Sequence, residues 1–172
     1  LRNQTDINFS VVFVDYGSEE PLVNGLKQLC NTYEFVTPYF LPVSQLLWNK
    51  SKALNYGILQ SQSPNIFIAD VDLIFHPEAT QLFNKLAGED KFFLFNLGYL
   101  DRAESGKLTK AYYFEDLIPS RFGKVNGMIL SPTKAFFEVN GLDEFFHFYG
   151  SEDEDLFAMM GNAGYKSEVN TT

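Results

Sequence analysis

Two aspartates one residue apart, Asp70 and Asp72, follow an apolar run that begins at Ile66. A short apolar run is typical of a buried strand, most often in a parallel sheet that is covered on both faces. The aspartates would then lie at the carboxyl end of the strand, where open α/β sheets bind their ligands. Because residues two apart on a strand point to the same side, both carboxylates can face one ion.

A carboxylate pair in this position predicts a metal ion. Two unpaired carboxylates at the end of a buried strand would lose hydration and repel each other. A divalent cation removes that cost, and carboxylate oxygens suit Mg²⁺, Ca²⁺ or Mn²⁺. So short a triplet also occurs where aspartates simply cap backbone amides at a strand exit, so its meaning depends on the rest of the chain.

A second acidic cluster opens the last helix that we expect, at about 150–162, and comprises Glu152, Asp153, Glu154 and Asp155. Crowded carboxylates hold protons more tightly than isolated ones, which suits a general base near neutral pH. Helical spacing places Glu152 and Asp155 on one side of the helix, with Asp153 and Glu154 less well aligned. Acidic residues in a first helical turn also interact favourably with the helix dipole, so part of this cluster needs no catalytic role.

Apolar strand patterns alternate with helical patterns along the chain, which predicts an α/β fold with a largely parallel sheet. The irregular stretch 97–123 is expected to be a long loop or lid, with at most one extra strand at 110–114. The other strands are expected at 9–14, 33–37, from 66 onwards, 91–96 and 125–130, and the helices at 19–31, 44–61 with Ser44 as N-cap, 77–86, 131–139 and 150–162.

Length and composition favour one globular domain spanning 1–172, since 45% of the 172 residues are hydrophobic and 16% are aromatic. A net charge of −9 argues against nucleic acid or an anionic membrane as the main partner. Cys30 is the single cysteine, which excludes an intrachain disulfide and a cysteine-based zinc site. No apolar run is long enough to predict a membrane span. We therefore expect a cytoplasmic location, with the inner face of a membrane as the alternative.

Four segments, in a fixed order, resemble nucleotide-sugar glycosyltransferases with the GT-A fold. Residues 14–18 (VDYGS) resemble the uracil-binding turn, 48–57 resemble the Lys- and Asn-containing segment before the metal strand, and 70–74 (DVDLI) resemble the D-x-D metal motif. Residues 127–156 resemble the longest and most specific pattern, which ends in a G-x-E-D sequence. The relatives with these patterns are glycosyltransferase family 2, chondroitin-polymerase-like enzymes and the C-terminal part of β-1,4-galactosyltransferases.

The resemblance implies an inverting, metal-dependent transfer of a hexose or N-acetylhexosamine from a UDP-sugar to a hydroxyl of an oligosaccharide or polysaccharide. It implies a Rossmann-like, mostly parallel central sheet flanked by helices, with a nucleotide-binding part at about 1–96 and an acceptor part at about 97–172. It also implies that the family's first strand and C-terminal tail are missing. That tail often carries a metal-binding histidine, which neither His76 nor His147 matches.

The same resemblance implies roles for individual residues. Asp72 and Asp70 would bind Mn²⁺ or Mg²⁺, Asp153 would be the catalytic base, and Glu152 beside it would bind the acceptor. The remaining substrate contacts are expected at Asp15, Lys52, Asn55, Asp70, Gly127 and Tyr149. Each also has an ordinary alternative: a turn-forming aspartate at Asp15, a solvated helix lysine at Lys52, and core packing for Tyr149.

Two other functions stay open at the level of sequence. A metal-dependent nucleotidyltransferase or phosphohydrolase also uses an aspartate pair at a strand end, although the glycine-rich phosphate loop expected there is missing. A degenerate, non-catalytic transferase domain could bind only a glycan or a partner protein. A pure glycan binder would show no metal-dependent affinity for UDP, which separates it from a transferase.

Overall fold

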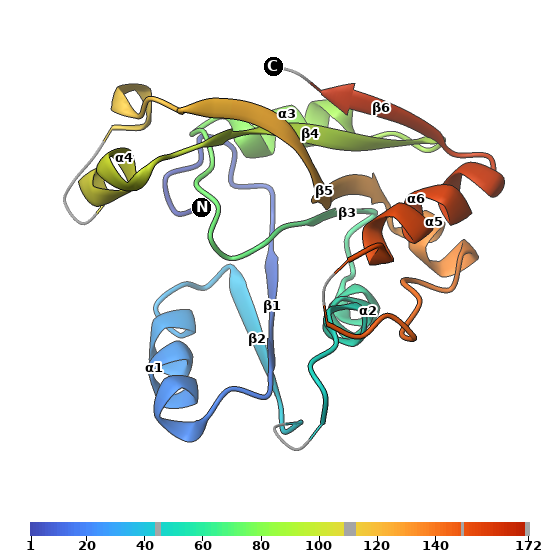
Figure 1. Cartoon of the computed structure of the whole chain (residues 1–172), viewed down its shortest axis with the longest axis horizontal. Helices are drawn as coiled ribbons and strands as arrows, with labels where there is room; N and C mark the ends of the chain where they lie inside the picture. Colours follow the sequence, from blue (N-terminus) through green and yellow to red (C-terminus); the bar gives the residue numbers. More distant parts are fainter. Residues whose placement is uncertain (44–45, 109–112, 149, 171–172) are drawn as a thin grey trace.

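The computed structural model of the protein describes residues 1–43, 46–108, 113–148 and 150–170. Helices and strands alternate over most of this range, as the apolar patterns predict (Figure 1). The elements are β1 Val11–Tyr16, α1 Glu20–Cys30, β2 Val36–Leu41, α2 Lys50–Gln60, β3 Asn65–Ile68, α3 Ala79–Leu86, β4 Lys91–Tyr99, α4 Arg102–Lys107, a 3-10 helix Phe114–Asp116, β5 Arg121–Pro132, α5 Thr133–Glu138, α6 Glu152–Asn162 and β6 Lys166–Asn170.

The described strands form two separate sheets, so the prediction of one mostly parallel central sheet needs correction. β1 and β2 form a parallel pair, and the other four strands follow the order β3-β5-β4-β6. In the four-stranded sheet β5 runs antiparallel to both β3 and β4, and only β4 and β6 are parallel. The difference arises because β5 pairs back on the strand that precedes it, whereas a parallel neighbour needs a crossover. An apolar pattern identifies a strand but not its direction.

Two element boundaries differ from the sequence expectation. β2 covers Val36–Leu41, whereas the strand was predicted at 33–37, and it continues past Pro38. β2 pairs with β1 alone, and an edge strand tolerates a residue without an N–H group. α2 begins at Lys50 rather than near Ser44, because the Asn49 side chain caps it by accepting a 2.9 Å hydrogen bond from the Lys52 N–H. Ser44 itself lies outside the described residues.

The stretch 97–123 is more regular than the predicted loop. β4 continues to Tyr99, which pairs with Arg121 at the start of β5, and α4 and the 3-10 helix lie between them. Gly98 is needed for this pairing, since a Cβ atom there would come within 2.6 Å of the Pro119 ring. Most of the predicted strand 110–114 lies outside the described residues, and β6 was not predicted.

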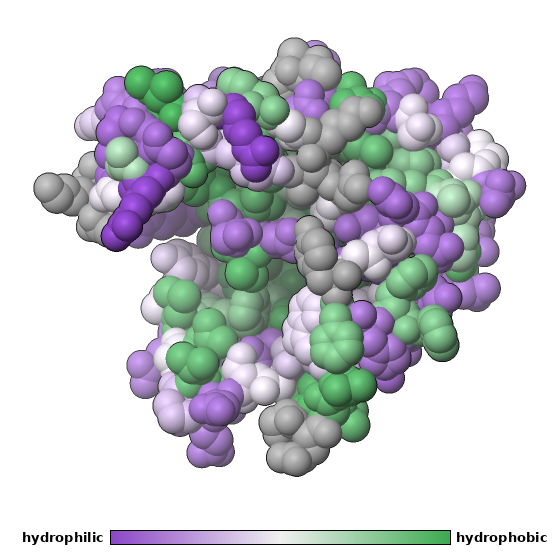
Figure 2. Space-filling view, viewed as in Figure 1, coloured by the Kyte–Doolittle hydropathy of each residue, from purple (hydrophilic) through white to green (hydrophobic). Residues whose placement is uncertain are grey.

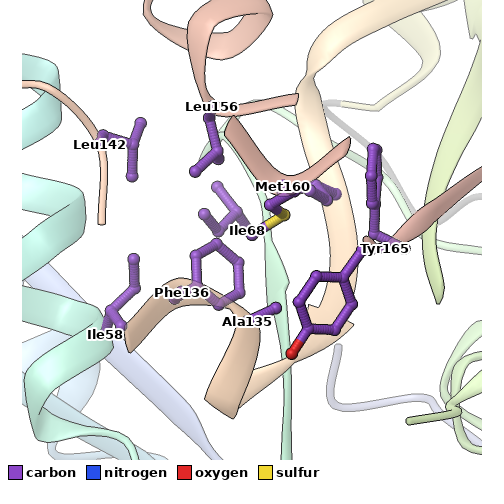
Figure 3. Packing of buried hydrophobic residues seen from close by; sticks show 10 residues of the cluster. Ile58, Ile68, Ala135, Phe136, Leu142, Leu156, Met160 and Tyr165 are labelled. Carbon is purple, nitrogen blue, oxygen red and sulfur yellow. The ribbon is translucent and has the colours of Figure 1, made fainter. Parts of the chain in front are cut away.

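The main core lies on both faces of the four-stranded sheet, because successive side chains of β4 point to opposite sides. Phe92 joins a cluster with residues of α2, α5 and α6, in which Phe136 is fully buried among Ile58 and Ile68 (Figure 3). Phe93 and Phe95 join a second cluster that includes α3 residues on the other face. Helices therefore cover both faces of this sheet, as the apolar strands predict.

Candidate active site

Three parts of the chain meet at the ammonium group of Lys50. The Nζ atom lies 3.4 Å from Glu152 Oε1, 3.8 Å from Asp153 Oδ2 and 3.9 Å from Asp70 Oδ1. In Figure 1 the start of α2, the start of α6 and the chain after β3 come together near the centre of the view. Asp70 of the aspartate motif and the acidic helix start, which are far apart in the sequence, therefore share one site.

The start of α2 is fixed by Asn49, which is only 1% exposed. Its side-chain amide caps the helix and also donates a 2.8 Å hydrogen bond to the Glu144 carbonyl oxygen. Asn49 further forms an isolated parallel bridge with Phe148. Because the segment 144–148 leads directly to α6, these bonds hold the starts of α2 and α6 in register, and Lys50 is placed against the α6 acids.

The start of α6 is shaped by an unusual backbone. Phe148 and Ser151 have left-handed φ angles of 70° and 68°, and Gly150 has φ 119°. Such conformations cost about 1–3 kcal/mol for a residue with a side chain, and they concentrate at functional sites. The turn lets Glu152 fold back to accept a 3.1 Å hydrogen bond from the Gly150 N–H. Two consecutive residues, Glu152 and Asp153, thereby reach the same ammonium.

Burial and charge act together on the ionisable groups of this site. Burial raises the pKa of Asp153 above its ordinary value, and the nearby Lys50 charge opposes this without cancelling it. Burial alone would lower the pKa of Lys50, but attraction to Asp153, Asp70 and Glu152 outweighs it and raises that pKa. Lys50 therefore stays charged near neutral pH, and Asp153 is a more basic carboxylate than usual.

Gly127 on β5 forms the floor of the site. A Cβ atom at this position would lie 3.1 Å from Lys50 Nζ, 3.3 Å from Asp70 Oδ2 and 3.9 Å from Asp153 Oδ2. The absent side chain leaves a small space toward which the ammonium and two carboxylates all face. The expectation that a ligand approaches the backbone at Gly127 closely stays a prediction.

The aspartate motif lies just beyond its strand. β3 ends at Ile68. Asp70 precedes the turn that follows, Asp72 lies in this turn, and both residues are exposed. The argument that strand geometry points both carboxylates to one side therefore does not apply. Among the described residues no group of three or more His, Cys, Asp or Glu side chains is arranged to hold a metal ion.

The donor chemistry around Gly127 nevertheless fits a hard divalent cation. An oxygen of Asp70 lies 3.3 Å from the Gly127 Cβ position, and Mg²⁺ or Mn²⁺ prefers carboxylate oxygens. The Lys50 ammonium lies in the same space. A cation can therefore occupy this space only if the Lys50 side chain moves out of it.

Of the other predicted site residues, Asp15 and Asn55 make contacts of their own, away from the Lys50 ion pairs. Asp15, at the end of β1, is 7% exposed and accepts hydrogen bonds from the Ser18 N–H at 3.0 Å and the Ser18 hydroxyl at 2.5 Å. Asn55 bonds to the Leu142 backbone and to Glu144, which fixes the loop between α5 and α6. Tyr149 lies outside the described residues. The substrate roles of Asp15, Asn55 and Lys52 stay predictions.

Sequence reasoning chose Lys52 and missed Lys50, which makes the ion pairs. The two lysines lie two residues apart, and a helix assumed to begin at Ser44 gives no reason to prefer either. Asn49 was the available signal, because asparagine is a favoured N-cap and would make Lys50 the first residue of the helix.

Similarity to known proteins is found with a family model and with a solved structure. The sequence model of the family described as "Glycosyl transferase family 2" matches residues 1–146. No curated protein matches the chain. The catalytic domain of Drosophila β1,4-galactosyltransferase 7, solved in complex with xylobiose, aligns with 96% of this chain at 14% identity and a TM-score of 0.44. The chain spans 65% of the length of that structure. In the described part of the chain, no helix combines the length and apolar character that a bilayer crossing requires.

Proposed function

Since the chain belongs to glycosyl transferase family 2, we propose that it transfers a hexose or N-acetylhexosamine from a UDP-sugar to a hydroxyl of a glycan acceptor, with inversion. One observation carries the proposal. Asp70, from the D-x-D motif after β3, and Asp153, from the acidic start of α6, converge on Lys50 above Gly127. This arrangement offers a group for the leaving diphosphate and a base for the acceptor in one site.

Asp153 is the proposed general base. Inversion needs a base that removes the proton of the acceptor hydroxyl while the oxygen attacks the sugar carbon from the side opposite the diphosphate. Burial makes Asp153 more basic than an ordinary aspartate, which favours proton transfer at the moment of attack. Glu152 is 3% exposed, and its two oxygens face Gly150 and Lys50, so we assign it the role of holding the start of α6 in place.

The donor is proposed to lie between β1 and the aspartate turn. Asp15 would accept the uracil N–H, and Lys50 and Lys52 at the start of α2 would bind phosphate oxygens as point charges. Mn²⁺ or Mg²⁺ held by Asp70 and Asp72 would supply Lewis-acid stabilisation of the departing diphosphate. Gly127 leaves space for the sugar beside these groups.

The acceptor is proposed to approach along exposed aromatic side chains next to the base. Trp48 is 47% exposed and Phe148 is 60% exposed. Their backbones are joined by a 3.4 Å hydrogen bond from the Phe148 N–H to the Trp48 carbonyl oxygen. Exposed aromatic faces bind the apolar face of a sugar ring. Trp48 directly precedes Asn49, and Phe148 lies four residues before Glu152.

The test is a screen of UDP-sugars for Mn²⁺-dependent transfer or hydrolysis, with Asp72→Ala and Asp153→Ala variants. Asp72→Ala is expected to abolish metal-dependent UDP binding. Asp153→Ala is expected to bind UDP as the wild type does and to lose transfer by about 10²–10⁴-fold, the usual contribution of a general base. Asp155→Asn removes the same charge from the same helix turn and serves as the matched control.

Unchanged turnover in both alanine variants would refute the proposal. Release of sugar 1-phosphate in place of UDP, with transfer of the uridylyl group, would instead assign a nucleotidyltransferase. Glycan binding without any metal-dependent affinity for UDP would assign a non-catalytic binding domain.

A further inference from the structure

The Lys50 side chain occupies the space where the acidic residues of the site converge. It lies within 4 Å of three carboxylates, those of Asp70, Glu152 and Asp153, while its own side chain is only 14% exposed. Three carboxylates facing one ammonium leave an excess of negative charge if all are ionised. The group is therefore held together by Lys50 but is not neutralised by it.

We infer that Lys50 is an internal counter-ion that competes with a divalent cation for these carboxylates, so that cation binding at Asp70 releases Lys50 from the acidic cluster. The inference rests on the proposed function only in taking Asp70 as a cation ligand. The new element is the behaviour of Lys50, which holds the three acids together in the absence of the cation and leaves them when the cation binds.

Sterics and charge both make the two cations exclusive. At Gly127 the ammonium lies 3.1 Å from the Cβ position, between oxygens of Asp70 and Asp153. A divalent cation on the Asp70 carboxylate would repel this ammonium, whose side chain is only 14% exposed, although solvent reaches the 48% exposed Asp70 and screens part of the repulsion. Lysine has a flexible four-carbon stem, so it can withdraw without movement of the capped start of α2.

Competition predicts a gain in metal affinity when the charge of Lys50 is removed. Isothermal titration with MnCl₂ alone, without nucleotide or sugar, should show that Lys50→Met binds Mn²⁺ about tenfold more tightly than the wild type, or better. Lys50→Arg, which keeps the charge, should bind like the wild type. Lys134→Met is the matched control, because it removes one charge from an exposed lysine that pairs with Glu89 at 3.9 Å.

A second measurement uses the wild-type chain, so it does not depend on whether the Lys50→Met variant folds. Acetylation of lysines by an amine-reactive reagent, followed by mass spectrometry, should be slow at Lys50 and should accelerate several-fold as MgCl₂ saturates the site. The acetylation rate of Lys134 should not change. A structural lysine that merely held the fold would stay protected at every Mg²⁺ concentration.

Equal Mn²⁺ affinity in the wild type and Lys50→Met, or a Lys50 acetylation rate that ignores Mg²⁺, would overturn the inference. Because neither assay contains a sugar donor, this failure is separate from failure of the proposed transfer reaction, which is decided by UDP-sugar turnover. Mn²⁺ binding by Lys50→Met alone would be the strongest support, since it would show that the lysine blocks the site.

Discussion

Gly127 shows how one missing side chain can decide a function. Its Cβ position lies in contact with Lys50 and Asp70, both of which have flexible polar ends. Gly127→Ala should therefore move these ends rather than the backbone. We expect transfer to fall by about tenfold or more, because small misplacements in an active site are costly. The melting temperature should change by only a few degrees, since the strand itself favours alanine over glycine.

Gly123→Ala on the same strand is the control for this prediction. Its Cβ would lie in ordinary contact, 3.5 Å from the Tyr99 ring, so both turnover and stability should stay close to wild type. Turnover of Gly127→Ala equal to that of Gly123→Ala would show that the site does not depend on the space above Gly127.

Asp153 makes a prediction about pH with a definite sign. Burial raises the pKa of Asp153 above the ordinary aspartate value of 3.8, and the Lys50 charge partly offsets this. A base works only when ionised, so turnover should fall as the pH decreases through this raised pKa. Removing the positive charge in Lys50→Met should raise the pKa further and move the acidic limb of the profile to higher pH.

The same shift also enters the stability of the fold. The folded state holds the Asp153 proton more tightly than the unfolded chain, so stability is lost as the pH rises from 3.8 through the raised pKa. The pH dependence of kcat/KM in the wild type, Lys50→Met and Lys134→Met measures the catalytic part. An acidic limb that stays in place, or moves to lower pH, in Lys50→Met would remove Asp153 from the role of base.

At the scale of elements, the sequence predicted the presence of helices and strands better than their ends. The apolar pattern placed both ends of α1, α3 and α6 within two residues. In α1 the pattern does not mark a buried face, because Leu22 and Leu29 are exposed. The start of α2 was missed because it is set by a side-chain cap at Asn49, which is fixed by contacts with Glu144 and Phe148. Asn49 itself was a local signal for the cap, but its contacts across about a hundred residues have none.

The expectation that the two acidic motifs share a site came from the resemblance to a family and not from apolar periodicity. The resemblance implied that the aspartate pair, with Asp72 as its main metal ligand, and Asp153 would serve one site. Asp70 of that pair and Asp153 both lie within 4 Å of Lys50, whereas the place of Asp72 in this site stays a prediction. The detailed reason was wrong, since Asp70 lies after the end of β3 and not on it. The positive φ angles at Phe148 and Ser151, which turn α6 toward the site, could not be read from residue types that normally avoid them.

At the scale of the whole molecule, the two sheets differ greatly in how they are buried. Both apolar clusters lie on the four-stranded sheet. In β1, α1 and β2, which the structure describes in full, Cys30 is the one buried apolar side chain and Asp15 the one buried polar side chain. Figure 2 shows the surface hollowed between this unit and the four-stranded sheet. A two-stranded sheet with so few buried side chains is marginal by itself.

Hydrogen exchange should therefore divide the molecule into a stable and a less stable part. Regions with few buried apolar contacts open at lower free energy than the core. Amides of β1 and β2 should exchange about tenfold faster than those of β4 and β5, or faster still, as measured by mass spectrometry of peptides. UDP with Mn²⁺ should slow exchange at residues 15–18 if Asp15 accepts the uracil N–H, and UDP with EDTA should do so less. Uniform protection of both sheets would contradict the expected difference in stability. Protection by UDP confined to β4 and β5 would place the nucleotide elsewhere in the molecule.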